Sequence, residues 1–320
     1  MPLVSVIIAA YNARRTIERA VRSALDQSHR ELEVLVIDDG SRDDTAERAA
    51  RLGATVLTQP NQGPGAARNL GLEAARGELI QFLDADDVLH PHKVQRCLPV
   101  PGRATLRFCH QAFFADGTPP LRSRDLRLGG GALQERFTFD PDRPLCSALA
   151  FPIGTLRPLH RADALRRIGG FDPELRNLED VLLNVSLVLA GRRFELVDEA
   201  LVFCRDHATP GRLRNAPDAL QHAARGEEKI LAAVQRASAL DQPGVRHALA
   251  SRWASLARRQ LVAGDQDSAR RSLEVLRGLG ARGRLVLSRN KLYNEAAAWL
   301  GIGAVAGLER TVRGYRARAT

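Results

Sequence analysis

Short apolar segments alternate with longer amphipathic ones over the first hundred residues, and this alternation restricts the fold more than any other feature of the sequence. Four apolar segments are continuous, rich in β-branched residues and bounded by polar residues, which is typical of buried strands. They cover residues 3–9, 32–37, 54–57 and 78–83. Stretches with helical spacing of apolar residues lie between them, at residues 13–25, 44–52 and 65–76. Because parallel strands need crossover connections that are usually helices, we predict an α/β fold with a mostly parallel sheet and helices on both faces.

The rest of the chain contains a mixed stretch followed by a purely helical one. In the mixed stretch we expect strands at residues 108–114, 137–139, 194–197 and 201–204, and helices at residues 161–168 and 179–190. From about residue 215 no strand-like run occurs, and Gly264-Asp265 interrupts a helical hairpin. Prolines and glycine cluster near residues 208–216, so we place a domain boundary there. The predicted parts are residues 1–210 and residues 211–320.

The net charge of +10 belongs to the last third of the chain. Residues 205–320 carry 21 Lys and Arg against 10 Asp and Glu, whereas residues 1–204 carry 26 against 27. A nucleic-acid-binding protein would combine a basic stripe with a module of base-reading or stacking residues, and the sequence shows no such module. We therefore expect no nucleic-acid partner. Two interpretations of the basic tail remain, a solvated helical cap and a surface that rests on an anionic membrane through the apolar segment Ala296–Leu308.

Acidic residues gather where predicted strands end. Asp38-Asp39 follows the second strand, Asp84-Ala85-Asp86-Asp87 follows the fourth, and Glu179-Asp180 opens a helix. Ligands of open α/β sheets bind at the carboxyl ends of the strands. Asp84 and Asp86 point the same way along an extended segment, and their oxygens suit Mg²⁺ or Mn²⁺. From this cluster alone, a polar loop of helix-capping aspartates explains the residues equally well.

Four motifs in order separate these two explanations. They are VSVIIAAYN at residues 4–12, VIDDGS at 36–41, GPGAARNLG at 63–71 and FLDADD at 82–87. The motifs GGFD at 169–172, ED at 179–180 and RDH at 205–207 continue the order. Together they closely resemble family 2 glycosyltransferases of the GT-A fold, over about residues 3–208. The resemblance implies a GT-A catalytic domain for a nucleotide-sugar over residues 1–210, with a basic helical C-terminal region.

The resemblance also implies the roles of individual residues around the donor. Ala10 and Tyr11 would line the base, and Asp38 or Asp39 would accept a hydrogen bond from uracil or ribose. Arg68 would lie beside the nucleotide, or else pair with one of the many aspartates. Asp84 would contact the ribose.

The same resemblance implies a metal and a catalytic base. Asp86 would bind Mn²⁺ or Mg²⁺, which would neutralise charge on the leaving diphosphate, and His207 would reach the metal or the diphosphate. Asp180 would take the proton from an acceptor hydroxyl as its oxygen attacks the anomeric carbon, which inverts the configuration. Glu179 would orient the acceptor or only begin a helix.

We therefore predict an inverting glycosyltransferase that transfers one sugar from a nucleoside-diphosphate sugar, with UDP the favoured carrier, to a glycan, lipid-linked or other hydroxyl acceptor. The processive, polymer-extruding synthases of the family that this chain resembles carry Gln-x-x-Arg-Trp and membrane helices. Here Leu249 precedes Arg252-Trp253 at the Gln position and no apolar run of membrane length occurs, so we expect a non-processive enzyme.

The alternatives are a sugar-phosphate nucleotidyltransferase, disfavoured because the first strand does not lead into a glycine-rich phosphate loop, and a non-catalytic interaction protein with a basic tail. With four cysteines in no CxxC pair and no signal-like start, a cytoplasmic location is expected, either free or at the membrane periphery.

Overall fold

The computed structural model describes residues 1–100, 105–115, 134–135, 139–150, 153–206 and 218–280. The chain divides into two compact units. Unit 1 consists of Met1–Pro144 and Phe151–Pro210, and unit 2 consists of Leu145–Ala150 and Gly211–Thr320. The predicted strand at residues 137–139 lies outside the described residues except for Phe139.

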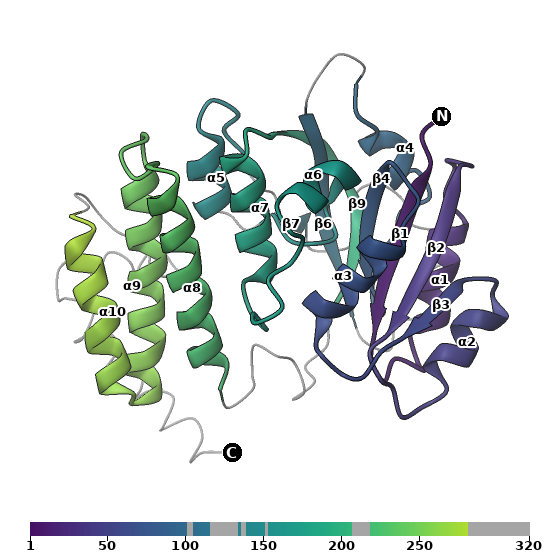
Figure 1. The fold of residues 1–320 in the computed structure, drawn as a ribbon, viewed down its shortest axis with the longest axis horizontal. Coiled ribbons are helices and arrows are strands. Elements are labelled where there is room, and N and C mark those ends of the chain that lie inside the picture. The colour runs from purple at the N-terminus through teal and green to yellow at the C-terminus, as the bar shows by residue number, and fades with distance from the viewer. Residues whose placement is uncertain (101–104, 116–133, 136–138, 151–152, 207–217, 281–320) are drawn as a thin grey trace. The chain divides into compact units, whose positions relative to one another are not determined.

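The N-terminal half of unit 1 is a parallel sheet with crossover helices, as the alternating pattern predicts (Figure 1). Strand β1 (Val4–Ala10) pairs in parallel with β2 (Leu32–Asp38) and with β4 (Leu79–Asp84), and β2 pairs in parallel with β3 (Thr55–Thr58). The helices between these strands are α1 (Ile17–Leu25), α2 (Thr45–Arg51) and α3 (Pro64–Ala74). This half of the sheet confirms the predicted α/β class.

The remaining strands extend the same sheet in mixed orientation. They are β5 (Val88–Leu89), β6 (Thr105–Ala115), β7 (Gln134–Glu135), β8 (Pro158–Arg161) and β9 (Arg193–Asp206). The strand order is β3-β2-β1-β4-β8-β6-β9-β5, and β7 pairs with β6. Strand β8 is antiparallel to β4 and β6, whereas β6 and β9 run parallel. The helices of this part are α4 (Lys93–Cys97), α6 (Ala162–Arg167) and α7 (Glu179–Leu189).

Strand β9 differs from the prediction of two separate strands. The prediction left residues 198–200 outside both strands, but the strand continues through them, and its pairing with β6 shifts register around His110. His110 Nε2 lies 3.0 Å from Asp198 Oδ1 at this irregularity. A bulge that supplies a polar partner therefore carries the strand past residues that would otherwise end it.

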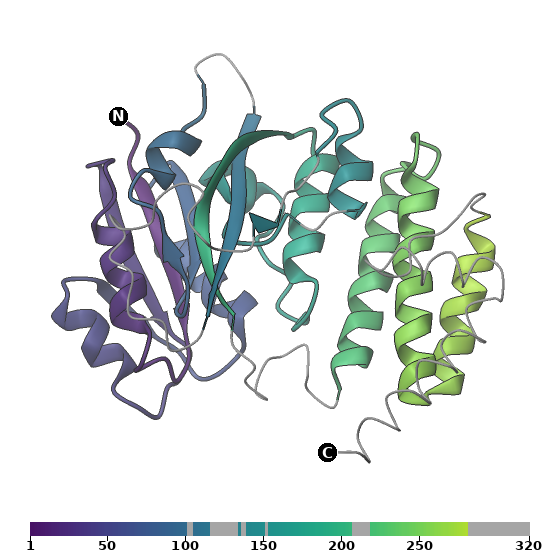
Figure 2. The same ribbon diagram turned by 180° about the vertical axis from the view of Figure 1, so that it is seen from behind.

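Alternation along β1 divides the core between the two faces of the sheet. Val4, Val6 and Ile8 belong to one core cluster with α1 residues such as Ile17, and Ile7 belongs to another, which includes residues of α3, α6 and α7. Helices α3 and α6 lie in front of the sheet in Figure 1, and α1 lies in front of it in Figure 2. Both faces are therefore covered, as the continuous apolar strands require.

Gly71 lets α3 approach β1 closely. A Cβ atom at this position would overlap Cγ2 of Ile7, so no larger side chain fits unless the Ile7 side chain or the helix moves. This close approach holds the part of α3 that carries Arg68 against the sheet.

Unit 2 is helical in its described residues, and its main helices are α8 (Ala219–Arg236), α9 (Val245–Ala263) and α10 (Gln266–Gly278). A short helix, α5 (Pro144–Ala150), contributes Leu145–Ala150 to this unit. The turn between α9 and α10 lies at the predicted Gly264-Asp265. Gly264 has φ +86° and ends α9, and the side chain of Asp265 caps α10 by accepting a hydrogen bond from Ser268 N at 3.1 Å. Among the described residues, no helix combines the length and apolarity that crossing a membrane requires.

Candidate functional site

Three parallel strands end together at the edge of the sheet where the motifs lie. In the pairing register Ala10 lies opposite Asp38, and Ala9 lies opposite Asp84. The carboxyl ends of β1, β2 and β4 therefore bring three of the predicted site residues to one edge. This is the edge at which α/β sheets of this kind bind ligands.

The loops after β1 and β2 are tied to each other. Asn12 N donates to Ser41 Oγ at 2.9 Å, Arg42 N donates to Asn12 Oδ1 at 2.9 Å, and Asp39 N donates to Ala10 O at 2.8 Å. Asn12 has a φ of +50°, which turns the chain sharply at this point. As a result Ala10 is buried and the side chain of Tyr11 is 48% exposed at the strand end. An exposed aromatic ring at a fixed loop is available to stack on a flat ligand group.

Asp38 and Asp39, which the sequence could not separate, have different partners. Asp39 is buried, and its carboxylate accepts three hydrogen bonds, from Gln59 Nε2 at 2.7 Å, Gln62 N at 2.9 Å and Gly63 N at 2.8 Å. Asp38 accepts a hydrogen bond from Ser41 N through Oδ2 at 3.3 Å, while its Oδ1 is buried with no hydrogen-bond partner. Asp39 thus holds the loop that leads into α3. Asp38 is the residue with an unused acceptor.

Arg68 on α3 joins the end of β4 to the beginning of α7. The side chain is buried, and its guanidinium donates to Asp84 Oδ1 at 2.8 Å and to Glu179 Oε1 at 3.2 Å. It also lies over the ring of Phe171, 5.3 Å from its centroid. Burial opposes the charge, but Asp84 and Glu179 together raise the pKa of Arg68 above its usual value. Arg68 thus pairs with two carboxylates, and these belong to two of the predicted motifs.

The acidic loop after β4 is held from two sides. Asp87 is buried, and its Oδ1 accepts a hydrogen bond from Arg205 N on β9 at 2.8 Å. Burial and the neighbouring charges of Asp86 and Asp84 raise the pKa of Asp87. On the other side, Arg19 Nη2 on α1 donates to Asp86 O at 3.2 Å. The conformation of the loop is therefore fixed by residues distant in sequence.

Sequence reasoning missed Arg19 as part of the site. Its guanidinium lies 4.6 Å from the ring centroid of Phe114 on β6, in a cation–π arrangement that accompanies its hydrogen bond to the loop. The helical pattern of residues 13–25 predicts the helix, but Arg19 is one of several arginines on it and no local signal distinguishes it. Asp87 was recognised as part of the acidic cluster but was given no role.

Glu179 and Asp180 form the first turn of α7. Glu179 pairs with Arg68, so its interactions go beyond those of a helix-starting carboxylate. Asp180 is half-buried, and its Oδ1 accepts a hydrogen bond from Val181 N at 2.8 Å. A carboxylate in the first turn is favoured by the positive end of the helix dipole. Arg68 therefore brings the residue next to Asp180 to the end of β4.

His207 lies outside the described residues. Strand β9, which leads to it, is tied to the acidic loop at Arg205. Within the described part of the chain, no group of three or more His, Cys, Asp or Glu side chains is arranged to hold a metal ion. The carboxylates at the acidic loop are those of Asp84, Asp86 and Asp87.

Comparison with known proteins agrees with the arrangement of this edge. The family model described as "Glycosyl transferase family 2" matches residues 5–166. The uncharacterised glycosyltransferase EpsJ of Bacillus subtilis is 28% identical over 225 residues, which cover 68% of this chain and 64% of EpsJ. The succinoglycan biosynthesis protein ExoO of Rhizobium meliloti is 41% identical over 102 residues, 31% of this chain and 29% of ExoO.

The relatives with higher identity share only part of their length with this chain. An uncharacterised glycosyltransferase of Nostoc is 44% identical over 103 residues, 30% of this chain and 32% of the Nostoc protein. The chain thus spans less than two thirds of the length of such relatives.

Solved structures show the same fold. Residues 1–349 of TarS from S. aureus, in complex with UDP-GlcNAc, match with a TM-score of 0.64 and 20% identity, over 98% of this chain and 92% of that one. The mannosyltransferase PcManGT from Pyrobaculum calidifontis, in complex with GDP-Man and Mn²⁺, matches with a TM-score of 0.51 and 19% identity, over 97% and 87%. These likenesses confirm the GT-A fold class predicted from the motifs.

Proposed function

Because the chain belongs to glycosyl transferase family 2, we propose that it transfers one sugar from a nucleoside-diphosphate sugar to a hydroxyl of an acceptor, with inversion at the anomeric carbon. One observation carries the proposal. Arg68 forms ion pairs with Asp84, at the end of β4, and with Glu179, the neighbour of Asp180. The FLDADD motif, proposed to bind the sugar donor, and the ED motif, proposed to contain the general base, therefore lie at one edge of the sheet.

The donor nucleotide would bind at the ends of β1 and β2. Tyr11 offers an exposed ring for the base, and Asp38 Oδ1 offers a buried acceptor that has no protein partner. A uracil N–H or a ribose hydroxyl would donate a hydrogen bond to this oxygen. A buried acceptor that has no hydrogen-bond donor costs free energy. We favour UDP as the carrier, since TarS is bound to UDP-GlcNAc, although PcManGT is bound to GDP-Man. Asp39 would act on the donor indirectly, by holding the loop before α3.

The acidic loop would supply oxygen ligands for a divalent cation. Asp84 and Asp86 provide carboxylate oxygens, and Mg²⁺ and Mn²⁺ are commonly held by one or two protein carboxylates together with substrate phosphates and water. When bound, the ion would supply Lewis-acid stabilisation of the departing diphosphate. We propose Mn²⁺ or Mg²⁺, with Asp86 as its main protein ligand and His207 as a further one.

Asp180 would act as the general base. Its carboxylate would accept the proton of the acceptor hydroxyl while that oxygen forms a bond to the anomeric carbon. The bond from the anomeric carbon to the diphosphate breaks in the same step, and the nucleoside diphosphate leaves on the opposite side. Arg68 would position the site for this step, because it holds Asp84 and Glu179 in fixed places.

The acceptor in this proposal is a glycan. The name of ExoO refers to succinoglycan biosynthesis, which supports a role in polysaccharide assembly. A lipid-linked saccharide and other hydroxyl compounds are the alternatives. The predicted membrane contact rests on Ala296–Leu308, which lies outside the described residues.

A thermal-shift titration tests the donor site. UDP, GDP and TDP are added with and without Mn²⁺, and we expect one nucleotide with Mn²⁺ to stabilise the protein by about 2.7 kcal/mol at a hundred times its Kd. Asp38→Asn should reduce this stabilisation, because the new amide places a donor or a weaker acceptor where the ligand needs an oxygen. Asp26→Asn, an exposed aspartate at the end of α1, is the matched control and should leave the shift unchanged. Absence of a shift with every nucleotide would contradict the proposal.

A further inference from the structure

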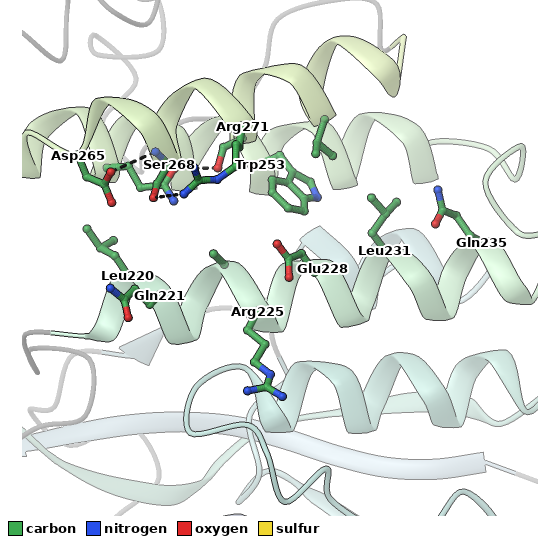
Figure 3. A pocket seen from close by; sticks show the side chains of 14 residues that line it. Leu220, Gln221, Arg225, Glu228, Leu231, Gln235, Trp253, Asp265, Ser268 and Arg271 are labelled. Carbon is green, nitrogen blue, oxygen red and sulfur yellow. Dashed lines mark hydrogen bonds between the residues drawn. The ribbon is translucent and has the colours of Figure 1, made fainter.

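A pocket of about 460 Å³ lies within unit 2, between α8, α9 and α10 (Figure 3). None of its lining residues takes part in the proposed transfer reaction. Pockets that bind small molecules usually have volumes of about 300–1,000 Å³. The size therefore suits a ligand of a few rings.

The floor of the pocket carries two side chains with N–H groups, those of Gln260 and Trp253. Gln260 is 2% exposed, and its Oε1 accepts a hydrogen bond from Ser272 Oγ at 2.7 Å, so the amide N–H groups are what its side chain can offer to a ligand. Trp253 is 3% exposed, and its Nε1 is buried with no hydrogen-bond partner. In Figure 3 its ring projects from α9 into the space between α8 and α10. The buried indole N–H of Trp253 has no acceptor in the free protein, which is unfavourable, and an oxygen atom of a ligand at the floor would supply one.

The walls of the pocket combine carboxylates with apolar side chains. Glu228 on α8 and Asp265 at the start of α10 supply acceptors, and Leu231 and Val275 supply apolar surface. Arg271 lies among these groups and donates to Ser268 Oγ at 2.8 Å.

The charges of the walls argue against a charged ligand. Arg225 also belongs to the lining, but its side chain points away from Trp253 in Figure 3. The carboxylates of Glu228 and Asp265 would repel an anion, and the guanidinium of Arg271 would repel a cation. A neutral ligand with many hydroxyl groups meets neither obstacle. Its hydroxyl groups can accept hydrogen bonds from the N–H groups of Trp253 and Gln260 and donate hydrogen bonds to the carboxylates of Glu228 and Asp265. Its C–H face can pack on the apolar side chains.

We propose that this pocket binds a short neutral oligosaccharide. The binding itself rests only on the pocket. Its use, to hold part of a glycan acceptor away from the reacting end, rests on the proposed function.

Tryptophan fluorescence reports this binding directly. The chain has two tryptophans, so Trp299→Phe leaves Trp253 as the only one. Chitotetraose, cellotetraose, maltotetraose and mannotetraose are titrated separately into the full chain carrying this change. We expect a saturable change in emission with at least one of them.

Two further substitutions decide whether the signal comes from the pocket. Glu228→Gln should weaken binding roughly threefold to tenfold, the effect of one lost hydrogen bond. Glu274→Gln, an exposed carboxylate on α10 outside the pocket lining, should leave the affinity unchanged. Equal affinities in these two variants would overturn the proposal, as would the absence of a response to all four saccharides.

A second comparison separates this proposal from the transfer activity. The saccharide titration is repeated with Asp86→Ala, which should lose nucleotide and metal binding but keep the fluorescence response. If Asp86→Ala abolishes the response, the saccharide binds at the transfer site and the pocket proposal fails. If no saccharide binds while UDP with Mn²⁺ still stabilises the protein, the pocket proposal fails and the proposed function stands.

Discussion

Arg68→Met tests the buried ion-pair network at the sheet edge. Methionine keeps much of the length of the side chain but removes the charge and the hydrogen bonds to Asp84 and Glu179. Both carboxylates then remain at the edge without their cation. We expect a loss of stability and a loss of nucleotide binding together.

The size of the stability loss follows from the exposure of the two partners. Removing one partner of a buried ion pair costs about 3–5 kcal/mol. The side chain of Glu179 is 13% exposed, but that of Asp84 is 37% exposed and is partly screened by water. We therefore expect the free energy of unfolding to fall by about 2–4 kcal/mol, with most of the loss from Glu179. For a domain of this size, that corresponds to a decrease in Tm of about 4–16 °C.

Urea unfolding and thermal melting of the purified variants measure this effect. Arg68→Lys is the control, because an ammonium can meet either carboxylate but cannot bridge both with a planar fork, and its loss should be intermediate. Adding Glu179→Gln to Arg68→Met should recover part of the stability, since it removes the unpaired charge. If Arg68→Met melts at the wild-type temperature, the guanidinium does not hold the site together and the reasoning is wrong.

Three other substitutions test separate parts of the structure. Asp39→Ala should lower the free energy of unfolding by about 2–4 kcal/mol in urea, because three donors of the loop before α3 lose their acceptor; an unchanged value would contradict the assigned role. Burial and Lys93 lower the pKa of His160 to about 3, so the wild type loses stability as the pH falls from about 6.5 towards 3, where only the unfolded state binds the proton. The stability of His160→Leu relative to the wild type should therefore rise by about 2 kcal/mol between pH 7.5 and pH 5, and a constant difference would refute a neutral buried imidazole. Arg19→Gln should weaken binding of UDP with Mn²⁺ by about threefold to tenfold in calorimetry, since the acidic loop loses a support, whereas unchanged binding would show that the contact is only structural.

The strands and crossover helices of unit 1 could be predicted because local chemistry specifies them. Continuous β-branched segments such as Val4–Ala10 are buried on both faces, and polar motifs fall where those strands end. The meeting of Asp38 and Asp84 at one edge follows from parallel pairing alone. The bulge that carries β9 past Asp198 was not predictable, because the partner that compensates it, His110, is on another strand.

Individual roles within the acidic motifs required the structure. Asp38 and Asp39 are chemically identical neighbours, and only the fold shows that Asp39 binds the loop before α3 while Asp38 keeps an unused oxygen. The support of Asp86 by Arg19 depends on a contact across 67 positions of sequence. Such long-range polar contacts leave no periodicity or spacing in the sequence by which they could be found.

Release of nucleoside diphosphate tests the central claim most directly, that this edge of the sheet transfers a sugar with Asp180 as the base. UDP-glucose, UDP-GlcNAc and GDP-mannose are each incubated with Mn²⁺ and an oligosaccharide acceptor, and release is compared between the wild type and Asp180→Asn. We predict release from one donor by the wild type and a fall of about 10²–10⁴-fold in Asp180→Asn, with its affinity for the nucleotide unchanged. Equal release by the two proteins would contradict the account.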